Sequence, residues 1–418
     1  MASTIITNIK LLGGVRETSV VLRGKALAEF PSIENAYLII EDDTISSYGS
    51  MDQLKYQPAA GGTNFKFRLN ASGRIIFPAW CDSHTHLVFA GSREEEFVDK
   101  IKGLSYADIA ARGGGILNSA NKLKNTSEDV LFNEALKRLE ELSRLGTGAI
   151  EMKSGYGLET EAELKMLRVI KKLKQRSNLD IKATFLGAHT YPLAYKEDHQ
   201  AYIDLIINEM LPVIARDELA DFIDVFCETG FFSPEETEMI CKAGMQLGLK
   251  TKIHANQLNA SGGVQTGVKL NALSVDHLET MDEDAMDALS NSKTIGTLLP
   301  TAAFFLRMPF QPARALIDKG CAIALASDYN PGSSPSGNMN FVVSLSCIQM
   351  KMLPEEAINA ATLNGAYAMD LGDKLGSITV GKKANLILTK PIPSLSYLPY
   401  SFGSNHIEQV MIGGNWLI

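Results

Sequence analysis

The sequence lacks several features that mark specialised classes of protein. No apolar run approaches the ~20 residues that a membrane-spanning helix needs. The N-terminal stretch does not combine a basic start with a long apolar segment, so we expect no signal peptide. The five cysteines are scattered and show no Cys-x-x-Cys spacing, which argues against a disulfide framework and against a cysteine-ligated zinc site. These absences predict a soluble, cytoplasmic protein.

Positive charge is also scarce. The 418 residues include 40 Lys and Arg against 48 Asp and Glu, a formal net charge of -8. Because nucleic-acid affinity comes mainly from Lys and Arg contacts to phosphate, this balance disfavours a nucleic acid as partner. Hydrophobic residues make up 45% of the chain, which is enough apolar surface to exclude a disordered protein. We therefore expect a globular protein that acts on a small molecule, with no membrane or nucleic-acid partner.

Two local patterns divide the chain into predicted domains. Residues 1–72 contain short strands broken by turns, such as 36–40 and 44–48, and residues 373–418 return to this β character. Between them, apolar runs alternate with amphipathic helical stretches, for example 128–145, where apolar side chains recur on one face. We predict a central barrel domain at 73–372 and one small β-sandwich domain built from both chain ends.

Eight apolar runs are candidates for the barrel strands. They are Arg74–Phe77 (leading to His86), Ala149–Met152, Ile181–Leu186, Phe222–Cys227, Lys250–His254, Ala272–His277, Thr294–Leu298 and Ala322–Ala326. Strands with two apolar faces, separated by amphipathic helices, indicate a parallel sheet that helices cover. Eight such units favour an α/β fold of the (β/α)₈ type over an open doubly wound sheet. No Gly-x-Gly-x-x-Gly follows the first strand, which also argues against a dinucleotide fold.

Five of the seven histidines fall at the C-terminal ends of these predicted strands, where catalytic groups of this fold gather. They are His84, His86, His189, His254 and His277, and Asp328 follows the eighth strand. A lone histidine at a strand end is usually only a polar residue there, but five of seven favour a shared site. His-x-His on a strand puts both imidazoles on one side, because side chains alternate with period two. Imidazoles and a carboxylate in this arrangement suit Zn²⁺ or iron better than Mg²⁺.

Several motifs carry a resemblance that covers nearly the whole chain. They are Pro78–His86, His86–Arg93, Arg112–Gly115, Ser154–Leu158, Phe185–Thr190 and Ser327–Pro335. The first resembles the opening strand of the amidohydrolase superfamily, which are metal-dependent hydrolases on (β/α)₈ barrels. Together the motifs resemble, more closely, the imidazolonepropionase family of histidine degradation. The resemblance implies hydrolysis of the cyclic amide of 4-imidazolone-5-propanoate to N-formimidoyl-L-glutamate, by a homodimer.

The resemblance also implies roles for individual residues. One Zn²⁺ or iron ion (Fe²⁺ or Fe³⁺) would be held by His84, His86, His254 and Asp328. Proton transfer and oxyanion stabilisation would fall to His277 and Asp328. The substrate would contact Arg93, Tyr156, His189, Gln257, Asn330, Gly332 and Ser333. Taken alone, Arg93 before three glutamates is typical of a salt-bridged surface, Tyr156 of loop packing and Asn330–Ser333 of an ordinary turn.

This chain departs from the family pattern at two strand ends. Many family members have an acidic residue where Gln257 stands, three positions after His254. An amide has no useful pKa, so Gln257 can bind a ring by hydrogen bonds but cannot be a general base. The fourth strand ends at Glu228 without the lysine that bridges two metals in binuclear relatives. We therefore expect one metal, with Glu228 either an ordinary strand-end glutamate or a bridging carboxylate.

Two other functions fit parts of the sequence. A superfamily aminohydrolase acting on a different heterocycle would share the metal ligands, but a neutral ring would not need Arg93. A catalytically inactive scaffold protein would be favoured only if metal ligands were missing, and all four are present.

Overall fold

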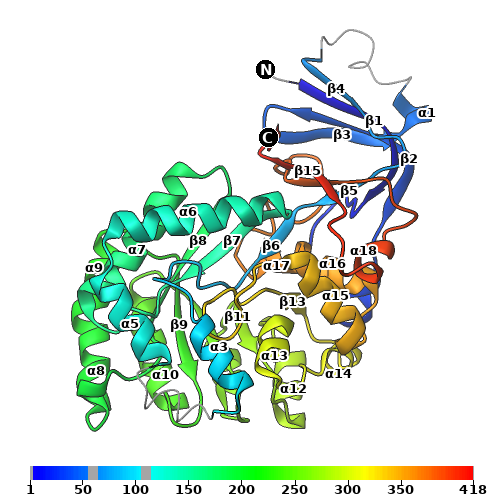
Figure 1. Cartoon of the computed structure of the whole chain (residues 1–418). Coiled ribbons are helices and arrows are strands. Elements are labelled where there is room, and N and C mark those ends of the chain that lie inside the picture. The colour runs from blue at the N-terminus through cyan, green and yellow to red at the C-terminus, as the bar shows by residue number, and fades with distance from the viewer. Residues whose placement is uncertain (1–2, 55–64, 105–113, 418) are drawn as a thin grey trace.

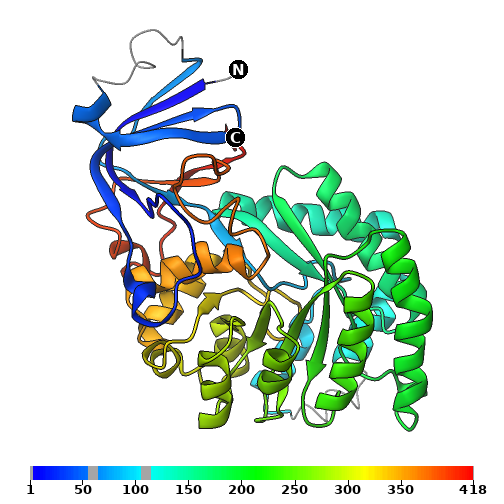
Figure 2. The ribbon, with the colours of Figure 1, turned by 180° about the vertical axis from the view of Figure 1, so that it is seen from behind.

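The computed structural model describes residues 3–54, 65–104 and 114–417. Within these residues, two sheets organise the chain: a barrel surrounded by helices, and a separate mixed sheet built from both chain ends (Figure 1). The view from behind shows the same two parts, with the N-terminus and the C-terminus both on the smaller sheet (Figure 2). This confirms the predicted fold class. The domain boundaries at 72/73 and 372/373 stay our proposal.

The barrel strands pair in parallel in the order of the sequence. They are β6 (Trp80–Asp82), β7 (Thr147–Lys153), β8 (Asp180–Ala188), β9 (Phe222–Cys227), β10 (Lys250–Ala255), β11 (Ser274–His277), β12 (Ile295–Leu298) and β13 (Ile323–Leu325). All seven residues of β7 and all six of β9 are buried. Parallel strands that are covered on both faces by side chains and helices read as continuous apolar runs, which is why the sequence located most of them.

The barrel closes at a seam between the segments that follow β6 and β13. The backbone N–H of Asp328 donates to His84 O at 3.0 Å, and that of His86 donates to Tyr329 O at 2.9 Å. Asp82 strengthens the seam, because its carboxylate accepts from the N–H of Ser327 at 3.0 Å and from its hydroxyl at 2.6 Å. This pairing brings the first and last strand ends side by side.

The prediction of Arg74–Phe77 as the first barrel strand is wrong. Ile75–Pro78 forms β5, which pairs in parallel with β1 and antiparallel with β14 in the mixed sheet. The first barrel strand is the three-residue β6, which is too short to show a pattern of its own. The mixed sheet contains β1 (Ser3–Gly13), β2 (Ser32–Glu41), β3 (Thr44–Ser50), β4 (Phe67–Asn70), β5, β14 (Leu386–Thr389), β15 (Ile407–Ile412) and β16 (Asn415–Trp416). The predicted small β domain therefore takes the form of one mixed sheet, in which β4 pairs with β1 beside the main path of strands.

Helices follow the barrel strands and cover the outside of the barrel (Figure 1). They are α3 (Glu94–Ile101), α5 (Ile116–Asn125), α6 (Glu128–Arg144), α7 (Thr160–Arg176), α8 (His199–Leu205), α9 (Leu211–Arg216), α10 (Pro234–Gln246), α11 (Gly263–Lys269), α12 (Glu283–Ser290), α13 (Pro300–Leu306), α14 (Ala313–Asp318), α15 (Met339–Met350), α16 (Pro354–Ala361) and α17 (Leu363–Tyr367). Two short helices, α1 (Met51–Leu54) and α18 (Tyr397–Tyr400), lie in the chain-end segments. No helix among the described residues combines the length and the apolar character needed to cross a membrane.

Local capping explains where individual helices begin. The Ser127 side chain accepts from the N–H of Val130 at the start of α6. At α10, Ser233 and Glu236 form a reciprocal capping box, which satisfies N–H groups that a helix start leaves free. These helices support the barrel strands whose C-terminal ends form the site described next.

Candidate metal centre and active site

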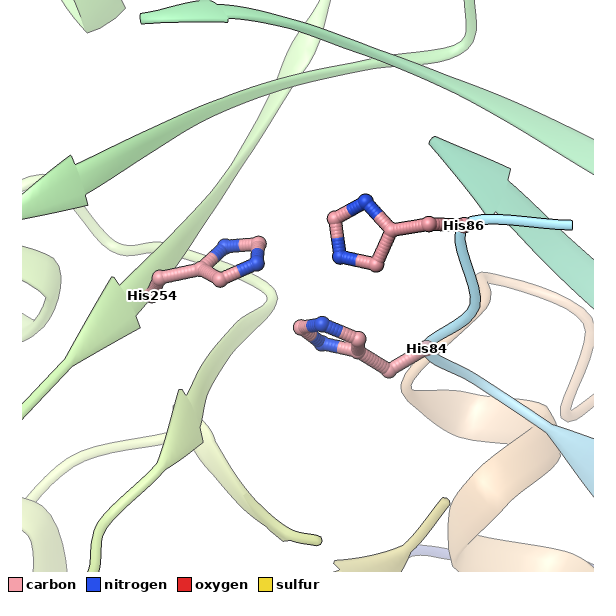
Figure 3. Close-up of side chains that lie close together, drawn as sticks. All are labelled: His84, His86 and His254. Carbon is pink, nitrogen blue, oxygen red and sulfur yellow. The ribbon is translucent and has the colours of Figure 1, made fainter. Parts of the chain in front are cut away.

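Three imidazoles from two strand ends converge inside the barrel mouth (Figure 3). His84 and His86 lie on the segment that follows β6, and His254 lies on β10. One ring nitrogen of each lies within 4.8 Å of one from each of the other two, and all three side chains are buried. His84 and His86 face the same side, as the predicted alternation of side chains requires. Thr85 between them points its hydroxyl away from the site, toward Glu151 O.

Asp328 joins this group through the barrel seam. Its Oδ1 lies 3.5 Å from His84 Nε2 and 3.6 Å from His86 Nε2. Asp328 is a non-glycine residue at φ 52°, a left-handed conformation that costs energy and occurs often at functional sites. The structure therefore brings together all four residues that the resemblance implied as metal ligands.

Two buried carboxylates orient the imidazoles from behind. Asp276 Oδ2 lies 2.7 Å from His84 Nδ1, and Asp224 Oδ2 lies 3.0 Å from His254 Nδ1. A carboxylate on Nδ1 fixes that nitrogen as the protonated one and leaves Nε2 with its lone pair free. Carboxylate–histidine pairs of this kind are the usual support of metal-ligating histidines.

The donor set fits a divalent metal ion. Nε2 of His84 and Nε2 of His254 are buried and make no hydrogen bond with any residue that the structure describes. Such atoms are costly to leave without a partner. Burial, followed by neighbouring positive groups, holds the pKa values of His84 and His86 well below the usual 6.5, so both imidazoles are neutral and able to ligate.

His277, the last residue of β11, lies beside this centre. Its ring nitrogen and atoms of His84 and Asp328 lie within 4.8 Å of one another. Burial acts to lower the pKa of His277, but Glu279 at 3.4 Å from its Nδ1, with Asp328 and Asp276, outweighs burial and raises it. His277 is held at φ 88°, a strained conformation for a residue with a side chain. His277 therefore lies beside His84 and Asp328, as the prediction of a shared site requires.

His189 and Tyr156 form one wall of the site. The His189 ring stacks on His86 with centroids 5.3 Å apart, and its Nδ1 lies 3.0 Å from Gly155 O. Burial lowers the pKa of His189 to about 3, so the ring is neutral. The centroid of the Tyr156 ring lies 5.7 Å from the ring centroids of His86 and His189. Burial, together with the nearby Asp328, raises the pKa of the Tyr156 hydroxyl, which therefore stays protonated.

Arg93 immediately precedes α3, and its guanidinium pairs with the carboxylate of Glu96 in the first turn of that helix. Its Nε and Nη2 contact Glu96 Oε2 at 2.9 and 2.5 Å, and both side chains are 11% exposed. Glu96 Oε1 in turn accepts from the N–H of Gly115. The Nη1 atom lies against Gly332, where a Cβ would meet it at 2.3 Å. The pairing to glutamate expected from the sequence is present, but it is largely buried. It engages Nε and Nη2, and no hydrogen bond from Nη1 is found among the described residues.

The loop after β13 is organised by Asn330. Its Oδ1 accepts from the N–H groups of Gly332 and Ser333, both at 2.8 Å, and its Nδ2 donates to Asp328 O and Ser333 Oγ. The Ser333 hydroxyl lies 3.1 Å from Asp328 Oδ2. These contacts occupy the amide of Asn330 and fix the position of the Asp328 carboxylate.

Gln257 lies beyond the end of β10 and is half-buried. Glu228 supports the neighbouring loop, since its Oε2 accepts from the N–H of Leu258 at 2.8 Å and of Asn259 at 3.2 Å. Its Oε1 accepts from the N–H of Thr229 at 2.7 Å. Both oxygens of Glu228 are thus engaged in the loop that carries Gln257, as expected for an ordinary strand-end glutamate.

Sequence reasoning missed the charged residues within the barrel strands. Asp224 and Asp276 lie beside the Nδ1 atoms of His254 and His84, and Glu151, Lys153 and Lys252 lie with them in the interior. A signal was present, because a charged residue inside an apolar strand is almost never fully buried unless it is paired. Arg112 and Gly113 of the family motif lie outside the described residues.

Comparison with known proteins places these features in a family. Residues 229–417 match the model of the amidohydrolase family. The imidazolonepropionase of Flavobacterium johnsoniae is 58% identical over 412 residues, which cover 98% of this chain and 99% of that protein. The imidazolonepropionase of Thermoanaerobacter pseudethanolicus is 43% identical over 388 residues, covering 93% of this chain and 91% of the relative.

Solved structures share the fold at low sequence identity. A guanine deaminase of E. coli superposes with a TM-score of 0.75 at 14% identity, covering 100% of this chain and 99% of the other. A zinc-bound adenosine deaminase of Xanthomonas campestris gives a TM-score of 0.69 at 16% identity, covering 99% and 92%. The structural likeness concerns the fold, whereas the sequence identity extends over nearly the whole length of the curated relatives. On that identity, the chain belongs to the imidazolonepropionase family of the amidohydrolases.

Proposed function

We propose that this chain hydrolyses the cyclic amide of 4-imidazolone-5-propanoate to N-formimidoyl-L-glutamate, a step of histidine degradation. The observation that carries the proposal is the 58% identity to a curated imidazolonepropionase over nearly the full length of both chains. The buried histidine cluster with the adjoining Asp328 carboxylate supports the proposal, because a metal-dependent hydrolysis requires such a set of ligands.

One Zn²⁺ or iron ion per chain would be held by His84, His86, His254 and Asp328. When bound, the metal lowers the pKa of a water molecule toward ~7 and so supplies a nucleophile at neutral pH. Neutral imidazoles with free Nε2 lone pairs and a buried carboxylate support this ligand set. Imidazole and carboxylate accept zinc and iron alike, so both metals are included.

Proton transfer belongs to Asp328 and His277. The carboxylate of Asp328 accepts a proton from the attacking water, while the Ser333 hydroxyl holds that carboxylate in place. His277 keeps its Nδ1 directed at Glu279, so its Nε2 delivers a proton to the ring nitrogen that must leave. In the same position, a protonated His277 stabilises the oxyanion of the tetrahedral intermediate.

The substrate propionate would pair with the Nη1–Nη2 edge of Arg93, because a guanidinium binds a carboxylate in a bidentate manner. Tyr156 donates its hydroxyl proton, and His189 accepts at Nε2 because its Nδ1 faces a carbonyl. Gln257 contributes hydrogen bonds to the ring. For Asn330, Gly332 and Ser333 we propose that the loop they form limits the pocket beside Arg93. Family resemblance further supports a cytoplasmic homodimer.

The test is turnover of freshly prepared 4-imidazolone-5-propanoate, followed by loss of its ultraviolet absorbance, with metal-loaded and chelated protein compared. Metal-dependent formation of formimidoylglutamate is the expected result. A metal-loaded protein that does not turn over this compound contradicts the proposed substrate, and a panel of cyclic amides and aminated rings then tests the aminohydrolase alternative. Sedimentation of the purified protein tests the dimer.

A further inference from the structure

Five ionisable side chains form a closed layer inside the barrel, next to the histidines. They are Glu151 and Lys153 on β7, Asp224 on β9, Lys252 on β10 and Asp276 on β11. None is more than 1% exposed. Buried charges are costly to remove from water and persist only where they are paired and hydrogen-bonded. This group, which we term the charge layer, therefore requires an explanation.

Lys153 lies at the centre of the charge layer. Its ammonium contacts Glu151 Oε1 at 2.5 Å and Asp224 Oδ2 at 2.8 Å, and lies 3.7 Å from Asp276 Oδ2. Burial acts to lower the pKa of Lys153, but Asp224, Glu151 and Asp276 outweigh burial and raise it, so the side chain stays protonated. Lys252 completes the layer by donating to Glu151 and to Ser83 O.

The same two oxygens that face Lys153 also face the ligating histidines. Asp224 Oδ2 lies 3.0 Å from His254 Nδ1, and Asp276 Oδ2 lies 2.7 Å from His84 Nδ1. Lys153 thus sits opposite both imidazoles across shared carboxylate oxygens. His84 and His254 come from strands that are not neighbours in the barrel, so Lys153 links two otherwise separate carboxylate–histidine pairs.

The charge of the layer is also suited to a cation. Its three carboxylates exceed its two ammonium groups by one negative charge. Removing the ammonium of Lys153 would take from Asp224 its ammonium partner at 2.8 Å, whereas Asp276 would keep only Lys252, whose Nζ lies 3.7 Å from its Oδ2.

We propose that Lys153 is a positioning residue of the metal centre, which holds Asp224 and Asp276 so that His84 and His254 direct their Nε2 atoms to one point. This inference rests on the metal centre of the proposed function. It assigns no contact between Lys153 and the substrate, and it predicts that metal affinity depends on a lysine that is not a ligand.

The experiment measures Zn²⁺ affinity of the full chain by competition with a chromophoric chelator, without substrate. Lys153→Met and Asp276→Asn are compared with the unmodified protein. We expect each to weaken Zn²⁺ binding by about 10–100-fold, the range seen when partners of ligating histidines are removed. The visible absorption spectrum of the Co²⁺-loaded protein should change as well, because it reports how the imidazoles are oriented around the metal.

Lys382→Met is the matched control, since it also removes a buried lysine, one that donates to backbone carbonyls of Gly372 and Leu375 rather than to the charge layer. It should retain Zn²⁺ affinity and the Co²⁺ spectrum even if its unfolding temperature falls. Asp276→Asn tests the carboxylate that Lys153 is proposed to hold. Lys153→Gln, which removes the charge but keeps a hydrogen-bond donor beside Asp224, gives the answer for Lys153 if Lys153→Met does not fold. Unchanged Zn²⁺ affinity and Co²⁺ spectrum in the folded variants would overturn the inference while leaving the proposed function intact. Failure of the unmodified protein to bind Zn²⁺ would instead overturn both.

Discussion

Asp276 Oδ2 accepts the Nδ1 proton of His84 at 2.7 Å, and neither side chain has any exposed surface. The contact links β11 to the segment after β6, although β11 and β6 are not paired with each other in the barrel. It leaves His84 Nε2 unprotonated beside Asp328, without a hydrogen bond to any part of the chain that the structure describes. Because such a nitrogen is costly to bury without a partner, the centre should gain stability when a metal ion binds.

Removal of the metal should therefore lower both activity and stability. We expect chelated protein to lose turnover and to unfold at a lower temperature, and added Zn²⁺ or Fe²⁺ to restore both. Calorimetry with and without chelator measures the shift. His84→Ala should unfold at the same temperature in both conditions, and a metal-dependent shift that persists in this variant would contradict the ligand assignment.

The roles of Gln257 and His277 can be separated by substitution. Gln257→Glu should keep measurable turnover, because the amide only donates or accepts hydrogen bonds. His277→Ala should lose most of it, about 10²–10⁴-fold in kcat, the usual contribution of a positioned acid or base. Steady-state kinetics of the two metal-loaded variants decides. The reverse order of activities would show that proton transfer has been placed on the wrong residue.

Arg93 should determine affinity for the propionate. Arg93→Met should raise KM and cost about 2–4 kcal/mol in kcat/KM, since the substrate propionate loses its guanidinium partner in a largely buried position. Arg216→Met, which removes an exposed arginine paired with the adjacent Asp217, should change neither parameter. A KM that does not respond to Arg93→Met would favour a neutral ring substrate.

Gly332 should matter because of its distance from Arg93. A Cβ at this position would meet Nη1 at 2.3 Å and Cζ at 3.0 Å, so the guanidinium must move. Gly332→Ala should raise KM while leaving the unfolding temperature nearly unchanged, because a flexible side chain gives way. Gly403→Ala, with nothing within 4 Å of the added Cβ, should leave KM unchanged. Equal KM values in the two variants would count against Arg93 as the propionate partner.

Lys382 should make stability depend on alkaline pH. Burial lowers its pKa from 10.5 to about 8. Between these values the folded chain binds fewer protons than the unfolded chain, so the free energy of unfolding rises with pH. The contribution is present in full above pH 10.5 and is lost as pH falls to about 8. Urea unfolding at pH 7.5 and pH 9.5 should show a steeper rise for the unmodified protein than for Lys382→Met, and parallel changes would refute this.

The sequence by itself determined the elements that depend on local pattern. Apolar runs separated by amphipathic helices predicted seven of the barrel strands, and His-x-His predicted that His84 and His86 face the same way. It did not locate β6, because three buried residues carry no periodicity.

Only the tertiary structure decided which charges meet. Lys153 and Asp276 are separated by more than a hundred residues, and nothing in their local sequence indicates that one ammonium lies near three carboxylates. The barrel brings their strands together, and exclusion of water then makes pairing of every interior charge necessary. The pairing of Arg93 with Glu96 is local, yet its burial depends on Gly115 and Gly332 from other loops. The local sequence pattern determines where the strands form and which side chains share a face. The packing of strands that are distant in the sequence determines which charged groups meet at the site.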